Sequence, residues 1–165
     1  KWLEKNSNKI LNLDSKVINE AIYRSILIKR KYVLKDEKEK QKNINSRAIL
    51  NFGHTFGHAL ETFYNYNKKL THGEAISIGM TIASKLSYKL NYLSLNEFNK
   101  ICNHFKLNKL PIYDKKMFDD KIFQIIEKDK KNINKKINFI LLNKIGKAFI
   151  NKSLDIKKIK QNLIK

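Results

Sequence analysis

Two histidines stand four residues apart in NFGHTFGHALE, residues 51–61, and each of them follows a glycine. Because residues at i and i+4 share one face of a helix, His54 and His58 can point toward the same ion or substrate. A third histidine, His72, begins the next apolar run, after a loop that allows it to fold back onto the first. Neutral imidazole is a common ligand of zinc and similar metals. The three histidines together predict a divalent metal site, whereas the isolated His104 predicts none.

These histidines belong to a polar stripe. If residues 47–61 form one helix, five polar groups fall within about a third of its circumference: Arg47, Asn51, His54, His58 and Glu61. A solvent-facing stripe in this lysine-rich chain would be expected to carry lysine, so the stripe indicates a polar cavity. Gly53 and Gly57 each cost about 1 kcal/mol relative to alanine in a helix interior. Their spacing of one turn predicts a groove that another backbone or a ligand approaches closely.

The surrounding pattern predicts a mainly helical domain, because glycine and proline are scarce and apolar residues recur with helical spacing. Asp14, Ser46 and Ser94 or Asn96 are candidate N-caps. The polar run 35–46 reads as a solvated loop. The predicted elements are helices near 15–34, 46–63, 72–90, 94–105, 119–131 and 154–165, and a short β-hairpin near 136–151.

Composition narrows the class of protein. The net charge is +20, but only three basic residues are arginine, and arginine is the usual reader of phosphates and bases. We therefore ascribe the charge to compositional drift and do not expect nucleic-acid binding. Cys102 is the single cysteine, which excludes a disulfide within the chain. No apolar run is long enough for a bilayer, and we expect a cytoplasmic protein without membrane contact.

Two longer motifs in the sequence are specific enough to indicate a protein family. LNFGHTFGHALE followed by HGEAISIGM closely resembles the signature of the 3-dehydroquinate synthase family. KWLEKN, AIYRSILIKRKYV and DEKE upstream, and LP and DKK downstream, follow the family's order. The resemblance covers residues 1–165 as a single helical C-terminal metal- and substrate-binding domain. It implies a fragment that lacks the family's N-terminal NAD-binding domain, in agreement with a chain that opens at Lys1 without an initiator methionine.

The resemblance also assigns roles to residues. It implies that His54 and His72 bind a divalent metal, most often zinc and alternatively cobalt, and that His58 handles protons. Glu39 matches a proposed proton acceptor, although its spacing to Arg47 is wider than in the family, which we attribute to a loop insertion. The implied substrate contacts are Lys29, Arg47, Asn51 and one of Lys130 and Lys131.

The third metal ligand implied by the family is a glutamate upstream of Lys1. We do not expect Glu61 or Glu74 to replace it, because Glu61 is a helix turn from His58 and Glu74 fits a capping role. The chain alone is therefore expected to be inactive and to bind zinc weakly.

The implied activity is conversion of 3-deoxy-arabino-heptulosonate 7-phosphate to 3-dehydroquinate and phosphate, a lyase step of aromatic amino acid biosynthesis that uses metal and NAD. NAD would be bound mainly by the missing domain, and a homodimer is expected. Three alternatives remain open: another sugar-phosphate cyclase, a metal-dependent polyol dehydrogenase of the same superfamily, and a basic nucleic-acid-binding helical domain. Product analysis, net NADH formation and salt-dependent binding would distinguish them.

Overall fold

The computed structural model describes residues 2–41, 43, 46–67, 69–128 and 137–164. Helices make up most of the described residues, and the two strands described form one antiparallel hairpin, which confirms the predicted mainly helical class. The elements in chain order are α1 (Trp2–Leu11), α2 (Ser15–Lys35), the 3-10 turn η1 (Arg47–Asn51), α3 (His54–Phe63), α4 (His72–Lys89), α5 (Leu95–Leu107), α6 (Asp120–Lys128), β1 (Ile137–Lys144), β2 (Lys147–Leu154) and α7 (Ile156–Ile164).

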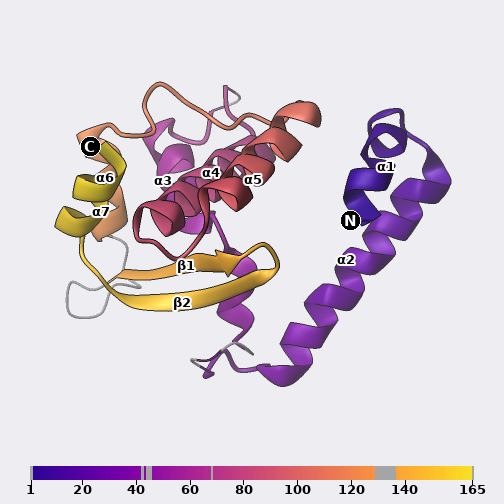
Figure 1. Ribbon diagram of the computed structural model, residues 1–165, viewed down its shortest axis with the longest axis horizontal. Coiled ribbons are helices and arrows are strands. Elements are labelled where there is room, and N and C mark those ends of the chain that lie inside the picture. Colours follow the sequence, from indigo (N-terminus) through magenta and orange to yellow (C-terminus); the bar gives the residue numbers. More distant parts are fainter. Residues whose placement is uncertain (1, 42, 44–45, 68, 129–136, 165) are drawn as a thin grey trace.

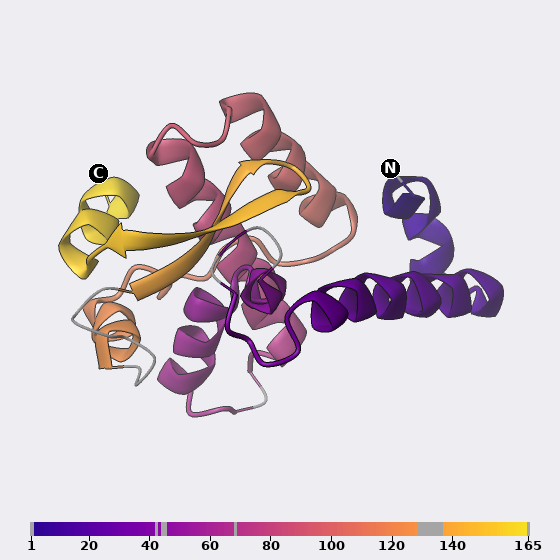
Figure 2. The same cartoon turned by 90° about the horizontal axis from the view of Figure 1, so that it is seen from below.

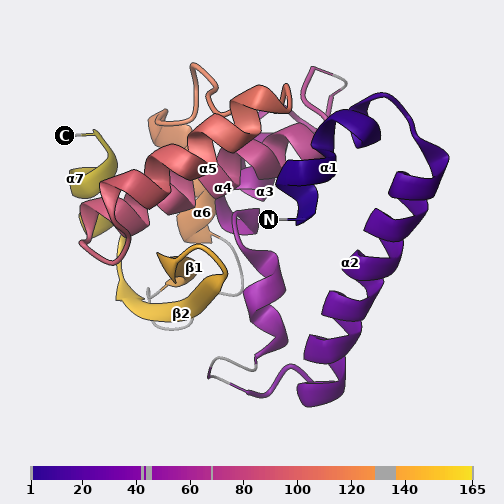
Figure 3. The same ribbon diagram turned by 45° about the vertical axis from the view of Figure 1, so that its right-hand side comes forward.

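Helices α1 and α2 form an arm that extends away from the rest of the molecule (Figure 1 and Figure 3). The predicted cap at Asp14 is confirmed, since its carboxylate accepts a hydrogen bond from the Val17 backbone N–H at 3.1 Å. The far end of α2 leads into a loop that returns to η1. This return places Lys29, near the end of α2, beside η1.

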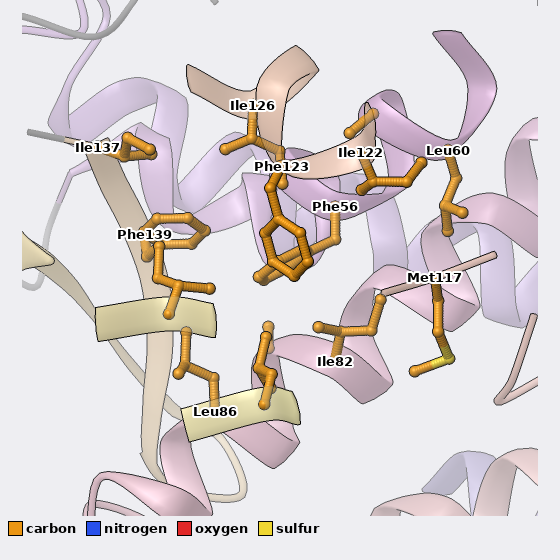
Figure 4. Packing of buried hydrophobic residues seen from close by; sticks show 14 of the residues in the cluster. Phe56, Leu60, Ile82, Leu86, Met117, Ile122, Phe123, Ile126, Ile137 and Phe139 are labelled. Atoms are coloured by element: carbon orange, nitrogen blue, oxygen red, sulfur yellow. The ribbon is translucent and has the colours of Figure 1, made fainter. Parts of the chain in front are cut away.

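The core lies between the central pair α3 and α4 and the elements packed around them. Its largest side chains include Phe56 from α3, Phe123 from α6 and Phe139 from β1, all at most 1% exposed (Figure 4). The Phe56 and Phe139 rings lie 5.3 Å apart, which ties α3 to the hairpin. Burial of such aromatic rings supplies much of the free energy that holds a domain of this size together. The core therefore fixes α3 and α4 from the side opposite their polar groups.

The hairpin crosses one side of the central helices (Figure 2). Pairing runs from Ile137 opposite Leu154 to Lys144 opposite Lys147, so the second strand extends three residues beyond the predicted limit of 151. The turn contains Gly146 at φ +83°, a left-handed conformation that favours glycine. No helix among the described residues is long and apolar enough to cross a bilayer.

The predicted continuous helix over residues 46–63 is wrong. Ser46 does cap the segment, accepting from the Ala48 N–H, but only the 3-10 turn η1 follows it. The chain then turns at Phe52 and Gly53, where Gly53 is left-handed with φ +83°, before α3 begins at His54. A 3-10 turn has 3.0 residues per turn instead of 3.6, and the chain turns at Gly53, so the side chains of η1 do not continue the α-helical face that the sequence pattern predicted.

Candidate metal and substrate site

Close packing of α3 against α4 is the feature that positions the histidines. A Cβ atom built on Gly79 would lie only 2.2 Å from the Gly53 carbonyl oxygen and 2.7 Å from the Gly57 nitrogen. A Cβ on Gly57 would likewise lie 3.1 Å from the Ala75 carbonyl oxygen. The predicted close approach at Gly53 and Gly57 is therefore confirmed, and the partner is the backbone of α4 rather than a ligand.

The start of α4 is fixed independently. Thr71 is its N-cap, and Thr71 and Glu74 form a reciprocal capping box in which Glu74 Oε2 accepts from the Thr71 N–H at 2.9 Å. The predicted capping role of Glu74 is thereby confirmed. Since Gly57 packs on Ala75 in the same first turn, the cap holds His72, the first residue of α4, beside the middle of α3.

The three histidines converge, as the spacing predicted. Ring centroids lie 5.2 Å apart for His54 and His58, 6.0 Å for His54 and His72, and 5.9 Å for His58 and His72. Single ligand atoms of His58, Glu61 and His72 also lie within 4.8 Å of one another. Imidazole and carboxylate are suitable donors for zinc and cobalt. The donor set therefore fits a divalent cation.

Two of the rings have an oriented Nδ1 atom. Nδ1 of His54 lies 3.4 Å from the Phe52 carbonyl oxygen, and Nδ1 of His72 lies 3.0 Å from Glu61 Oε1. When a carbonyl or carboxylate accepts from Nδ1, the other ring nitrogen, Nε2, is left as the free donor for a metal. Glu61, which belongs to the same predicted polar stripe as His58, thus reaches His72 on the neighbouring helix.

The charge state of His54 suits metal binding. Burial lowers its pKa from the ordinary 6.5, the hydrogen bond to the Phe52 carbonyl raises it, and repulsion by His58 and His72 lowers it again; Glu61 raises it. The net direction is downward. The imidazole is therefore neutral at neutral pH, which is the form that coordinates cations.

A cleft of about 450 Å³ gathers the residues predicted to bind substrate. Its lining includes Lys29 from α2, Glu39 from the following loop, Arg47 and Asn51 from η1, and His54 from α3. Arg47 Nε lies 3.3 Å from Glu39 Oε1. Although the continuous helix is absent, the break at Gly53 turns η1 so that its polar groups still meet His54. The guanidinium and ammonium groups make this cleft suitable for an anionic ligand.

Asp36 was missed by the sequence interpretation, which placed it in a solvated loop. Its side chain is 5% exposed, and its carboxylate accepts from the backbone N–H groups of Lys40, Gln41 and Arg47 at 2.8, 3.0 and 3.0 Å. Burial raises the pKa of Asp36, but the hydrogen bonds from Gln41, Arg47, Lys40 and Ser46 outweigh burial and lower it. Asp36 thus ties the loop to η1. Nothing in the local sequence distinguishes it from the neighbouring charged residues.

The same loop places Glu39 in an uncommon conformation. Glu39 has φ +51°, in the left-handed region that side-chain-bearing residues seldom occupy. Its N–H donates to the Asp36 carbonyl oxygen at 3.2 Å, which helps to hold this turn. Strained turns of this kind persist where surrounding contacts fix them, often at binding sites.

A second cleft, of about 680 Å³, is lined by the other two histidines of the cluster. Its lining includes His58, Glu61, His72, Tyr66 and Lys128. The histidine cluster thus borders two clefts, with His54 lining the first and His58 and His72 the second. Lys130 and Lys131, also predicted to contact substrate, lie outside the described residues.

Comparison with known proteins agrees with this arrangement. The sequence model of the family described as 3-dehydroquinate synthase C-terminal matches residues 1–132. The chain is 44% identical over 149 residues to the 3-dehydroquinate synthase of Pelagibacter ubique (strain HTCC1062), covering 88% of this chain and 39% of that protein. The chain thus spans about two-fifths of the length of this relative.

Solved structures share the fold. One is the 2-epi-5-epi-valiolone synthase ValA from Streptomyces hygroscopicus subsp. jinggangensis 5008 with NAD+ and Zn2+ bound; it has TM-score 0.79 at 18% identity, over 99% of this chain and 44% of that chain. Another is 2-deoxy-scyllo-inosose synthase complexed with carbaglucose-6-phosphate, NAD+ and Co2+, with TM-score 0.56 at 26% identity, over 76% of this chain and 35% of that chain. Because the family model matches residues 1–132, which is most of the length of the chain, the chain belongs to the 3-dehydroquinate synthase C-terminal family.

Proposed function

We propose that this chain is the metal- and substrate-binding part of a 3-dehydroquinate synthase, which converts 3-deoxy-arabino-heptulosonate 7-phosphate to 3-dehydroquinate and phosphate. The observation that carries the proposal is the convergence of His54, His58 and His72 next to the cleft lined by Arg47 and Lys29. Family membership and the name shared by the curated relatives support the same substrate.

His54 and His72 are the proposed metal ligands. Their donor atoms fit zinc or cobalt, and two solved structures that share the fold, ValA and 2-deoxy-scyllo-inosose synthase, hold Zn2+ and Co2+ respectively. When bound, such an ion supplies Lewis-acid polarisation of a substrate oxygen. NAD would supply the transient hydride acceptor, and we assign its binding to a part of the enzyme outside this chain.

The chain's own residues supply binding and proton handling. Arg47 and Lys29 bring positive charge to one cleft and can neutralise a substrate carboxylate or phosphate. Asn51, in the same cleft, can donate and accept hydrogen bonds with substrate hydroxyl groups. Lys130 and Lys131 stay predicted substrate contacts.

Proton handling is assigned to His58 and Glu39. The His58 ring stands 5.2 Å from that of His54 and lines the second cleft, where it can exchange a proton with substrate. Glu39 is held by Arg47 and is the proposed proton acceptor. The homodimer and the cytoplasmic location also stay predictions.

A chimera tests the proposal. The part of the Pelagibacter ubique relative that precedes its match to this chain would be joined upstream of Lys1. With zinc and NAD, we expect it to release phosphate from the heptulosonate phosphate and to form 3-dehydroquinate, whereas the 165-residue chain alone does not. The variants His54→Ala and His72→Ala should abolish turnover, and His104→Ala should not.

Three results would count against the proposal. Turnover that survives loss of His54 and His72 would remove the proposed metal pair. A different carbocyclic product would indicate another cyclase, and net NADH formation would indicate a polyol dehydrogenase. The intact relative from Pelagibacter ubique serves as the positive control for the assay.

A further inference from the structure

We infer that Glu61 is a positioning residue for His72, holding the imidazole with its proton on Nδ1 so that Nε2 faces the metal. This inference rests on the proposed function, because it concerns the same metal site. Glu61 Oε1 lies 3.0 Å from His72 Nδ1 across the gap between α3 and α4. The Glu61 side chain is only 11% exposed, whereas that of His72 is 61% exposed. The carboxylate is thus the embedded partner, and the imidazole is the group that it orients.

The embedding of Glu61 explains why it can impose an orientation. It stands one turn after His58 on α3, whose opposite face carries the buried Phe56 and Leu60. A site residue is held precisely when it sits on a packed helix and not on a loop. His72, by contrast, follows a loop and has mostly solvent around it. Without a fixed acceptor, its ring would be free to rotate and to exchange tautomers.

The roles of the two nearby carboxylates are divided. Both hydrogen bonds that Thr71 donates, from its N–H and its hydroxyl, go to Glu74 Oε2, so Glu74 serves the helix cap. Glu61 is the carboxylate that contacts His72. A divalent cation approaching three imidazoles in a chain of net charge +20 also benefits from a nearby negative charge. A carboxylate that accepts from the second nitrogen of a metal-binding histidine is a recurrent arrangement in metalloproteins.

A direct ligand role for Glu61 is the rival interpretation, because its oxygen also lies within 4.8 Å of the donor atoms of His58 and His72. The two roles respond differently to Glu61→Gln. The glutamine amide oxygen can still accept from Nδ1, so a positioning role is partly kept. A neutral amide is a poor zinc ligand, so a direct ligand role would be lost.

The test measures the zinc affinity of the 165-residue chain by calorimetry, with Zn2+ alone as the probe. We expect Glu61→Ala to weaken binding about 10- to 100-fold, the usual effect of losing such a partner, and Glu61→Gln to weaken it less. Glu74→Gln is the matched control: it removes one negative charge at the same helix start but keeps a capping box, and it should change affinity less than about twofold. A thermal melt confirms that each variant is folded.

A second readout needs no metal. Nitrogen-15 shifts of the His72 ring at about pH 8.5, where histidine is neutral, report which nitrogen carries the proton. We expect the Nδ1–H tautomer to dominate in the wild type and in Glu61→Gln, and to lose its dominance in Glu61→Ala.

Two results overturn the inference. One is an unchanged tautomer and zinc affinity in Glu61→Ala; the other is a loss in Glu61→Gln as large as in Glu61→Ala, which would make Glu61 a ligand. In either case, loss of zinc binding in His54→Ala and His72→Ala would still support the proposed metal site. If those two variants bind zinc as tightly as the wild type, the proposed function itself is contradicted, independently of the role of Glu61.

Discussion

Substitution of Gly79 by alanine should force α3 and α4 apart. The new Cβ would lie 2.2 Å from the Gly53 carbonyl oxygen, more than 1 Å inside the 3.4 Å at which ordinary contact begins. It would also lie 2.7 Å from the Gly57 nitrogen. Both neighbours are backbone atoms, which cannot rotate away as a side chain can. The helices themselves must therefore move.

The size of the effect follows from two opposing contributions. Overpacking of a close contact costs about 1–3 kcal/mol, and the upper end applies because two backbone atoms are struck. Replacing glycine by alanine inside a helix stabilises the folded state by about 1 kcal/mol. We expect a net loss of about 2 kcal/mol in the free energy of unfolding, or roughly 4–8 °C in melting temperature for a domain of this size.

Gly73→Ala is the matched control, because it lies in the same helix and no atom lies within 4 Å of its added Cβ. It should leave stability unchanged or raise it by up to about 1 kcal/mol. Thermal and urea unfolding of both variants give the comparison. Gly79→Ala should also weaken zinc binding, since helix separation moves His54 away from His72. A Gly79→Ala protein as stable as Gly73→Ala, with unchanged zinc affinity, would refute the close-packing argument.

Two further predictions concern buried polar groups. Ser87→Ala should lower the free energy of unfolding by about 1–3 kcal/mol, measured by urea titration, because the Ser87 hydroxyl accepts the buried Leu142 N–H of β1 at 3.0 Å. Ser84→Ala is the control, since that hydroxyl only donates to a carbonyl of its own helix, and an equal loss in both variants would contradict the reasoning. Asp36 has a pKa below its ordinary 3.8, so its contribution is present above that value and is lost as the pH falls through the lowered folded-state pKa. Melting temperatures measured from about pH 6 to pH 2 should therefore fall less steeply in Asp36→Asn, and a parallel fall would contradict this role.

The convergence of the three histidines was predictable because their positions are set by short-range rules. The i, i+4 spacing of His54 and His58 fixes their common face, and a cap at Thr71 fixes where His72 begins its helix. The caps at Asp14, Ser46 and Ser94 were recognisable for the same reason: each is a polar side chain that binds the backbone N–H two or three residues later. Local chemistry of this kind is visible in a single sequence.

Long-range contacts were less predictable. Gly53 read as a helix interior position, because nothing local shows that its backbone must turn at φ +83° to meet Met80. Asp36 read as one charge among many, although it binds Arg47 eleven residues later. The role of Glu61 was predicted from its spacing within its own helix, whereas its hydrogen-bond partner His72 belongs to the next helix. In each case the deciding neighbour is distant in the sequence.

The central claim is that His54 and His72 share one cation, and a double-mutant cycle on zinc affinity tests it most directly. Calorimetry would compare the wild type, His54→Ala, His72→Ala and the double variant, with His104→Ala as control. If both rings bind one ion, each single substitution should cost at least about tenfold, and the double variant should lose much less than the sum. Affinity unchanged by either substitution, or losses that simply add, would contradict the claim.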